Sequence, residues 1–193
     1  MVGGFSESKM IQHAIRSSFP NVKVVIPREA GLVVLKGAVL FGHSPSSVSQ
    51  RVCKNTYGVD KAVPFDNDKH DIRKKIDREG RPLCNDVFDK YVEIGQYVAL
   101  NEATTDQSYV PITENQTSSG VAIYASTQKS PMYVTDDGCV KIGYVRDKIL
   151  DKSVPREERS VLVSMRFGGT EIEVTAKEER TGNDTKAIVN FLG

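Results

Sequence analysis

The chain has 193 residues, enough for a substantial core, and 39% of them are hydrophobic. Its 26 lysines and arginines nearly balance 25 acidic residues, which argues against a nucleic-acid or membrane partner. No apolar run approaches the roughly 20 residues that span a bilayer, and no signal peptide is evident. Three widely spaced cysteines and three histidines without metal-ligand spacing predict reduced thiols, no metal ion and a cytoplasmic protein, with the nucleus as a second location.

The first fifty residues predict a helix, a short strand and a second helix. Ser6 is a candidate N-cap, and apolar residues follow it at helical spacing, at Met10, Ile11, Ala14 and Ile15. Residues 22–26 have the composition of a short buried strand. Residues 30–41 are apolar on nearly every face, so this helix requires a partner surface, which self-association through it would supply.

From residue 52 onward the pattern is that of strands. Residues 161–167, 172–176 and 187–191 largely alternate between apolar and polar side chains. Gly168-Gly169 and residues 181–184 separate these runs as turns, so they predict an antiparallel meander with one buried face. Two further strands are expected at 121–125 and 140–145, with a turn at 136–138. Short strands at this spacing indicate a mainly β protein, a sandwich or a barrel.

A charged segment at residues 60–81 interrupts the strands. It contains seven lysines or arginines, six acids and few apolar residues. One interpretation is a solvated, mobile loop. The other is a functional loop, because structureless loops of this length are uncommon in compact domains. No recognised catalytic motif occurs in the chain, such as a phosphate loop or a nucleophile elbow. Gly3 and Gly4 precede a helix, which suits either an anion site or an ordinary glycine turn.

Six motifs spread over the whole chain resemble the heat shock 70 kDa protein 12A/12B branch of the 70-kilodalton heat-shock chaperones. They are Val2-Gly3-Gly4-Phe5-Ser6-Glu7-Ser8, Val24-Val25-Ile26-Pro27, Leu35-Lys36-Gly37-Ala38-Val39-Leu40-Phe41-Gly42, Thr56-Tyr57-Gly58-Val59, Asp86-Val87-Phe88-Asp89-Lys90 and Phe167-Gly168-Gly169-Thr170-Glu171-Ile172. The resemblance implies that residues 1–51 are the end of an actin-like ATPase lobe and a linker. It implies that residues 52–193 are a substrate-binding-type β-sandwich with the charged segment as an insertion and without a helical lid.

The resemblance places Gly3 and Gly4 at the wall of the lobe that lies against the adenosine of bound ATP. Phe5 and Glu7 stand where conventional members carry serine and arginine, and a glutamate cannot stack a guanidinium on the base. The phosphate-binding and catalytic parts of the family lie outside this sequence. We therefore expect no ATP hydrolysis by this chain and no cofactor, with ATP bound only by the full-length relative.

The resemblance also implies a peptide-binding site in the sandwich, formed by Val59, Ala62, Tyr109, Val121 and Ile123. The alternative is that these are ordinary core residues. The function expected is non-catalytic binding of extended hydrophobic segments of peptides or unfolded proteins. A scaffold with a vestigial groove, whose partner docks on the charged insertion, is the alternative. A further hypothesis is that the insertion folds over the groove as a substitute lid.

Overall fold

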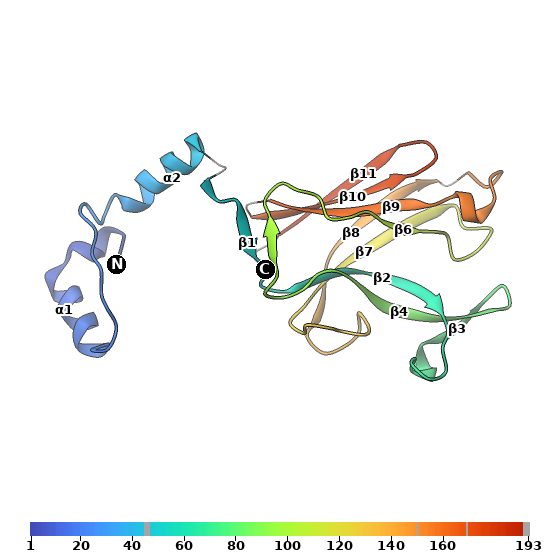
Figure 1. Cartoon of the computed structure of the whole chain (residues 1–193), viewed down its shortest axis with the longest axis horizontal. Coiled ribbons are helices and arrows are strands. Elements are labelled where there is room, and N and C mark those ends of the chain that lie inside the picture. Colours follow the sequence, from blue (N-terminus) through green and yellow to red (C-terminus); the bar gives the residue numbers. More distant parts are fainter. Residues whose placement is uncertain (45–46, 150, 169, 191–193) are drawn as a thin grey trace. The chain divides into compact units, whose positions relative to one another are not determined.

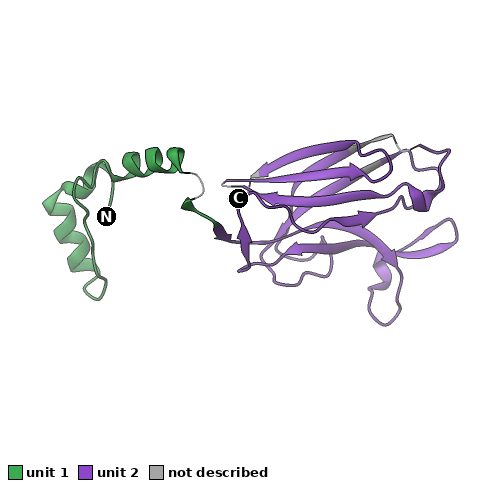
Figure 2. Cartoon of the chain, turned by 45° about the horizontal axis from the view of Figure 1, so that its top comes forward, with its two compact units in different colours: residues 1–49 green, residues 50–193 purple. Residues whose placement is uncertain are grey.

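The computed structural model describes residues 1–44, 47–149, 151–168 and 170–190. The chain divides into two compact units, Met1–Ser49 and Gln50–Gly193 (Figure 2). The first is helical and the second is built from strands (Figure 1).

The first unit contains the 3-10 helix η1 (Gly4–Glu7), α1 (Lys9–Ser18) and α2 (Val33–His43). The N-cap prediction for Ser6 is wrong, because Ser6 lies within η1 and donates its hydroxyl hydrogen to the Gly3 carbonyl, while Ser8 occupies the N-cap position of α1. The strand predicted at 22–26 is also wrong. Those residues are not in a strand, because no described segment pairs with them to form a ladder.

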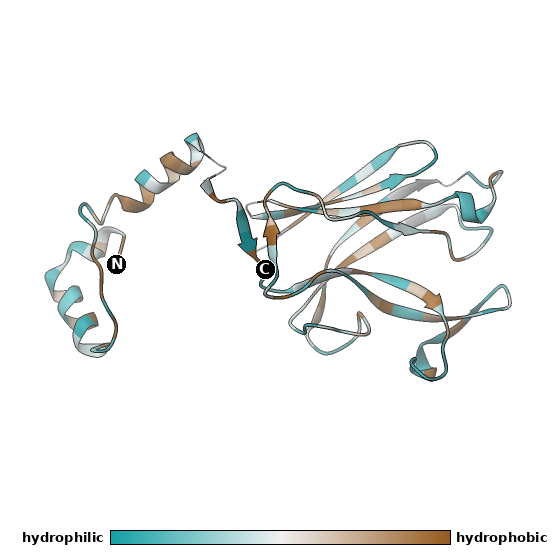
Figure 3. Ribbon diagram, viewed as in Figure 1, coloured by the Kyte–Doolittle hydropathy of each residue, from teal (hydrophilic) through white to brown (hydrophobic). Residues whose placement is uncertain are grey.

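The helix predicted at 30–41 forms as α2, about three residues further along at its start. None of the residues of α1 or α2 is buried. Much of the α2 ribbon has the brown of hydrophobic residues (Figure 3). Leu40 is 69% exposed and Leu35 is 63% exposed. Neither helix, nor any other helix in the described part of the chain, is long and apolar enough to cross a membrane.

The second unit is a mainly β sandwich, which confirms the predicted fold class. Its sheets have the strand orders β3-β4-β2-β7-β8, β11-β10-β9-β6 and β1-β5, and all paired strands are antiparallel. The strands are β1 (Gln50–Val52), β2 (Thr56–Pro64), β3 (Lys75–Arg78), β4 (Arg81–Val92), β5 (Tyr97–Ala99), β6 (Gln107–Tyr109), β7 (Ser118–Ser126), β8 (Cys139–Ile149), β9 (Val161–Phe167), β10 (Glu171–Glu178) and β11 (Asp184–Asn190). Two 3-10 helices, η3 (Ile72–Lys74) and η4 (Arg156–Glu158), join them.

One hydrophobic core fills the space between the two larger sheets. The predicted meander is confirmed as β9, β10 and β11, whose inward residues Val163, Met165 and Val174 are fully buried. Gly169 and Phe191 of that prediction lie outside the described residues. The strands predicted at 121–125 and 140–145 are confirmed as β7 and β8, which pair with each other.

The charged segment 60–81 is folded, so its interpretation as a structureless loop is wrong. It comprises the second half of β2, a turn, η3, β3 and the first residue of β4. Asp71 caps η3 by accepting a hydrogen bond from the Arg73 amide at 2.9 Å. Glu79 and Gly80 have φ angles of 55° and 73° and form the two-residue turn that joins β3 to β4. Positive φ at both central residues is typical of tight hairpins, because it matches the twist of the strands.

Candidate functional site

A divergence between two neighbouring strands opens the site. The pairing of β2 with β7 runs from Thr56 to Val59, whereas its pairing with β4 continues to Pro64. At the next residue, Asp60, the side chain and not the backbone bonds to β7: one carboxylate oxygen accepts a hydrogen bond from the Ala122 amide at 3.1 Å. Beyond Val59 the described residues of β2 form no ladder pairs with β7, and a space opens beside β2.

A bulge in β4 shapes the same stretch of β2. Lys61 pairs with Val87 and Val63 with Cys84, so Ala62 stands opposite two residues, Asn85 and Asp86. Asp86 has a φ of 60°, a left-handed conformation that aspartate tolerates better than most residues. Bulges bend a strand and redirect its side chains. Here Ala62 lines the space that opens where β2 leaves β7.

The space is a cavity of about 480 Å³ between β2, β4, the edge strand β6 and the segment that leads from β6 to β7. Three of the five predicted peptide-binding residues line it, namely Ala62, Tyr109 and Val121. The other two, Val59 and Ile123, are not exposed at all and belong to the hydrophobic core. The remaining lining residues are Asp60, Lys61, Asn85, Asp89, Gln107, Ser108, Val110, Ile112, Gln116 and Gly120.

The wall of this cavity carries a chain of polar contacts that joins the two sheets. The Lys61 ammonium lies 2.7 Å from the carboxylate of Asp89, and the Tyr109 hydroxyl donates to the same carboxylate at 2.6 Å. The Tyr91 hydroxyl lies 3.2 Å from that of Tyr109 and donates to the carbonyl of Val163 on β9 at 2.9 Å. Burial raises the pKa of both tyrosines well above the usual range, so they act as neutral hydrogen-bonding groups.

Asp60 is the titratable group at the point of divergence. Burial raises its pKa above the ordinary value of 3.8, although the hydrogen bond from the Ala122 amide and the charge of Lys141 act in the opposite direction. The lining contains two aspartates, Asp60 and Asp89, and one lysine, Lys61. The lining is apolar at Ala62, Ile112 and Val121, and it is polar along the wall formed by β4 and β6.

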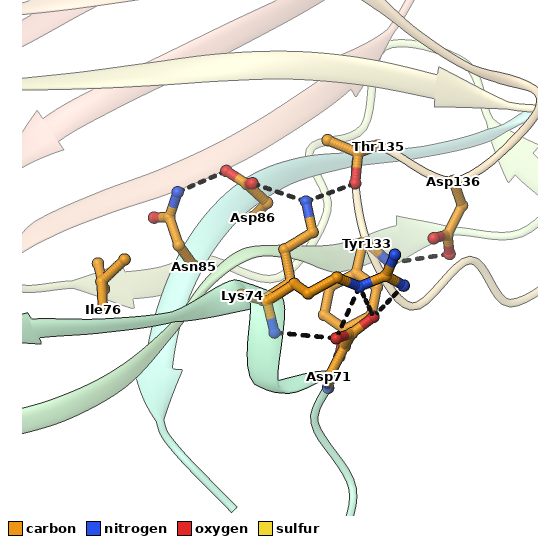
Figure 4. Close-up of a pocket in the computed structure, with 9 residues that line it drawn as sticks. Asp71, Lys74, Ile76, Asn85, Asp86, Tyr133, Thr135 and Asp136 are labelled. Carbon is orange, nitrogen blue, oxygen red and sulfur yellow. Dashed lines mark hydrogen bonds and ion pairs between the residues drawn. The ribbon is translucent and has the colours of Figure 1, made fainter.

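A second cavity, of about 450 Å³, lies between the charged insertion, β4 and residues 133–136 (Figure 4). Lys74 lines it, and its ammonium lies 2.9 Å from the Asp86 carboxylate and 2.7 Å from the Thr135 hydroxyl. The Asp71 amide donates to the Tyr133 hydroxyl at 2.9 Å. The neighbouring Arg73 lowers the pKa of Asp71 to about 2 through its side-chain hydrogen bonds. The charged groups of this cavity thus largely satisfy one another.

The predicted nucleotide-binding residues lie in the first unit. Gly3 has a φ of 95° and donates its amide to the Ala30 carbonyl at 2.9 Å. A Cβ added at Gly4 would meet nothing within 4 Å. Phe5 is 82% exposed, and a carboxylate oxygen of Glu7 accepts the Gly31 amide at 3.2 Å. Gly3 and Glu7 therefore hold residues 30–31 against η1, while Phe5 projects into solvent.

Potential metal ligands do not gather in the described ranges, where no three His, Cys, Asp or Glu residues form a suitable group. All three cysteines are free, and burial raises the pKa of Cys53 to about 11. Sequence reasoning did not identify Asp89, which lines the cavity, or Tyr91, whose hydroxyl lies next to that of the lining residue Tyr109. The family motif at 86–90 contains Asp89, but its partners Lys61 and Tyr109 are distant in the sequence.

Comparison with known proteins gives the family of the chain. No protein-family model matches it. It is 36% identical over 196 residues to heat shock 70 kDa protein 12A from Homo sapiens, and 35% identical over 201 residues to heat shock 70 kDa protein 12B from Homo sapiens. Heat shock 70 kDa protein 12A from Mus musculus is 35% identical over 196 residues. Each alignment covers the whole chain but only 29% of the relative. The chain belongs to the heat shock 70 kDa protein 12A/12B branch and spans less than a third of the length of these relatives.

Proposed function

We propose that the chain binds an extended apolar segment of another polypeptide in the cavity between β2 and β6. The observation that carries this proposal is the divergence of β2 from β7 after Val59, next to a cavity lined by Ala62, Tyr109 and Val121. Membership of a branch of the 70-kilodalton heat-shock proteins supports a relationship with chaperones.

The chemistry of such binding follows from the two kinds of lining. An extended peptide is recognised through its backbone when it lies along a strand, while pockets select alternate side chains. Residues 60–62 of β2 would offer backbone groups, and Ala62, Ile112 and Val121 would contact one aliphatic side chain of the peptide. The proposed activity is binding without catalysis. Affinity would be modest, because ordering a flexible segment consumes part of the binding free energy.

The test is a titration of a fluorescently labelled, leucine-rich extended peptide with the chain, followed by anisotropy. Ala62→Phe fills the cavity from β2, where Ala62 is only half-buried, whereas Val121 is 6% exposed and its replacement would disturb the core. Val140→Phe is the matched control, since Val140 lies on β8, is 61% exposed and is not a lining residue. We expect saturable binding that Ala62→Phe weakens at least ten-fold, about 1.4 kcal/mol, and Val140→Phe leaves unchanged. Absence of binding, or equal loss in both variants, would overturn the proposal.

A second function, docking of an acidic partner on the charged insertion, is favoured by one observation. The insertion is folded, and it presents Lys69 and Arg73 with side chains 74% and 86% exposed. Exposed charge contacts weaken as salt screens them, whereas contacts in an apolar cavity respond much less. Partner binding that disappears with added salt and with Arg73→Gln, but survives Ala62→Phe, would assign the function to the insertion.

A further inference from the structure

The connection between β6 and β7 forms one wall of the cavity and is fixed by a few polar contacts. It contributes Val110, Ile112 and Gln116 to the lining. Gln116 holds its own segment together: its side chain accepts the Ile112 amide at 2.8 Å and donates to the Ser118 carbonyl at 2.9 Å. The position of this segment therefore sets the width of the cavity.

Residues at the turn between β3 and β4 form hydrogen bonds with the backbone of this segment. The Glu79 carboxylate accepts the Glu114 amide at 3.1 Å and 3.2 Å with its two oxygens. The Arg81 guanidinium donates to the Ile112 carbonyl at 2.5 Å. We call these four residues, Glu79, Arg81, Ile112 and Glu114, the clasp. It connects the charged insertion to the wall of the cavity, although Glu79 and Arg81 do not line the cavity themselves.

A second set of contacts anchors the same segment to the connection between η4 and β9. Arg159, whose side chain is 1% exposed, donates to the carbonyls of Glu114 at 2.9 Å and Gln116 at 3.2 Å. It also lies 2.8 Å from the Glu114 carboxylate. Glu114 is thus held on two sides, with its amide at Glu79 and its carbonyl and carboxylate at Arg159.

The two sets of contacts differ in burial, and this difference suggests which one opens. The side chains of Glu79 and Arg81 are each 38% exposed, so water can replace their hydrogen bonds to the backbone, and each contributes about 1 kcal/mol. Arg159 is buried, and breaking a buried charged contact costs several times more. Thermal opening would therefore break the clasp first, while Arg159 holds the far side of the segment.

We propose that the clasp gates the cavity, so that its opening controls how fast a polypeptide segment associates and dissociates. This inference rests on the proposed function, because it concerns access to the same cavity. Glu79 and Arg81 act through the segment 112–116 and are positioning residues. When the clasp opens, Ile112 and Gln116 move away from Ala62, and the bound polypeptide is released. When the clasp closes, Ile112 and Gln116 contact the bound polypeptide again.

The test compares stopped-flow rates of the labelled peptide for the full chain and for Glu79→Ala and Arg81→Ala. We expect association and dissociation rate constants to rise together by about five-fold, with little change in affinity, since each variant removes one exposed contact. Glu79→Gln keeps an oxygen that accepts the Glu114 amide and should restore most of the slow rates. Arg180→Ala is the matched control, because Arg180 makes a comparably exposed ion pair, with Asp151, at a different hairpin. Unchanged rates in Glu79→Ala and Arg81→Ala would overturn the inference.

Amide hydrogen exchange separates failure of the clasp from failure of the proposed function, since it needs no peptide. Exchange of the Glu114 amide should be about five-fold faster in Glu79→Ala than in the unmodified chain. Unchanged exchange would overturn the clasp itself. Faster exchange with unchanged peptide rates would overturn gating while leaving the cavity as a binding site. If no peptide binds to the unmodified chain, the proposed function and gating both fail, and the exchange result still shows whether the clasp exists.

Discussion

The two units solve the burial of apolar side chains in opposite ways. In Gln50–Gly193 the inward faces of two sheets form one continuous core, in which residues such as Val163 and Met165 are fully buried. In Met1–Ser49 neither α1 nor α2 buries a residue, and α2 exposes Leu35, Val39 and Leu40 by more than half. Both units contain strongly apolar stretches. Hydrophobicity in the sequence therefore indicates which side chains tend to be buried, but only the second unit buries them within its own fold.

We propose that α2 packs against a second copy of the chain when no other surface covers it. Large exposed apolar patches on soluble proteins usually mark interaction sites.

The largest expected effect is on stability, and the same substitution should behave differently in each unit. Phe167 is 1% exposed, and its ring lies 5.8 Å from that of Tyr57, whereas Phe41 is 43% exposed. Phe167→Ala should lower the free energy of unfolding of the sandwich by about 3–5 kcal/mol, because it opens a cavity in the core. Urea unfolding followed by circular dichroism in the β-sheet region measures this change.

Phe41→Ala is the matched variant in the helical unit. It should leave the urea midpoint of the sandwich unchanged and weaken concentration-dependent association, as measured by sedimentation velocity. A chain that is monomeric at all concentrations would contradict self-association through α2. Comparable destabilisation by the two substitutions would mean that the units are not independent in stability.

A glycine in each unit provides the second contrast. A Cβ at Gly58 would lie 2.3 Å from the Asp89 carbonyl oxygen and 2.4 Å from the Phe88 ring, where β2 and β4 approach closely. Gly58→Ala should therefore destabilise the sandwich by about 1–3 kcal/mol, since neighbouring backbone must shift. A Cβ at Gly37 meets nothing within 4 Å, so Gly37→Ala should stabilise α2 by roughly 0.5–1 kcal/mol. Thermal melts report the first, and amide exchange in α2 reports the second. A neutral effect of Gly58→Ala would show that the two strands can separate there.

The smallest expected effect is a pH dependence at Asp60. Its folded-state pKa is raised, chiefly by burial, so folding favours the protonated acid. The stability contributed by that acid is fully present below the ordinary pKa of 3.8 and is lost as pH rises through the raised folded-state value. Asp60→Asn keeps an oxygen for the Ala122 amide and does not titrate. The unfolding free energy of Asp60→Asn, minus that of the unmodified chain, should therefore increase from acidic toward neutral pH. A difference that is constant with pH would contradict the raised pKa.

The candidate site was only partly predictable. The family resemblance named Ala62, Tyr109 and Val121, which line one cavity, although Val121 also belongs to the core. It also named Val59 and Ile123, which lie in the core and do not line the cavity. Adjacent strand residues point to opposite faces, but the twist and bulges that decide which of them reaches a cavity are not visible in sequence. The partners of Asp89 come from β2 and β6, and no local pattern connects them.

The sequence by itself determined the strands of the meander, because side chains at Val163, Met165 and Phe167 alternate with the period of a strand whatever their partner is. It also determined that α2 is an apolar helix that needs a cover. Only the tertiary structure decided that the charged residues 60–81 fold, since β3 forms by pairing with β4 and has little apolar pattern of its own. The clasp and the cavity likewise depend on contacts between residues more than 30 positions apart, as between Glu79 and Glu114. Such contacts form only in the folded chain, because bringing distant segments together costs loop-closure entropy that the rest of the fold must offset.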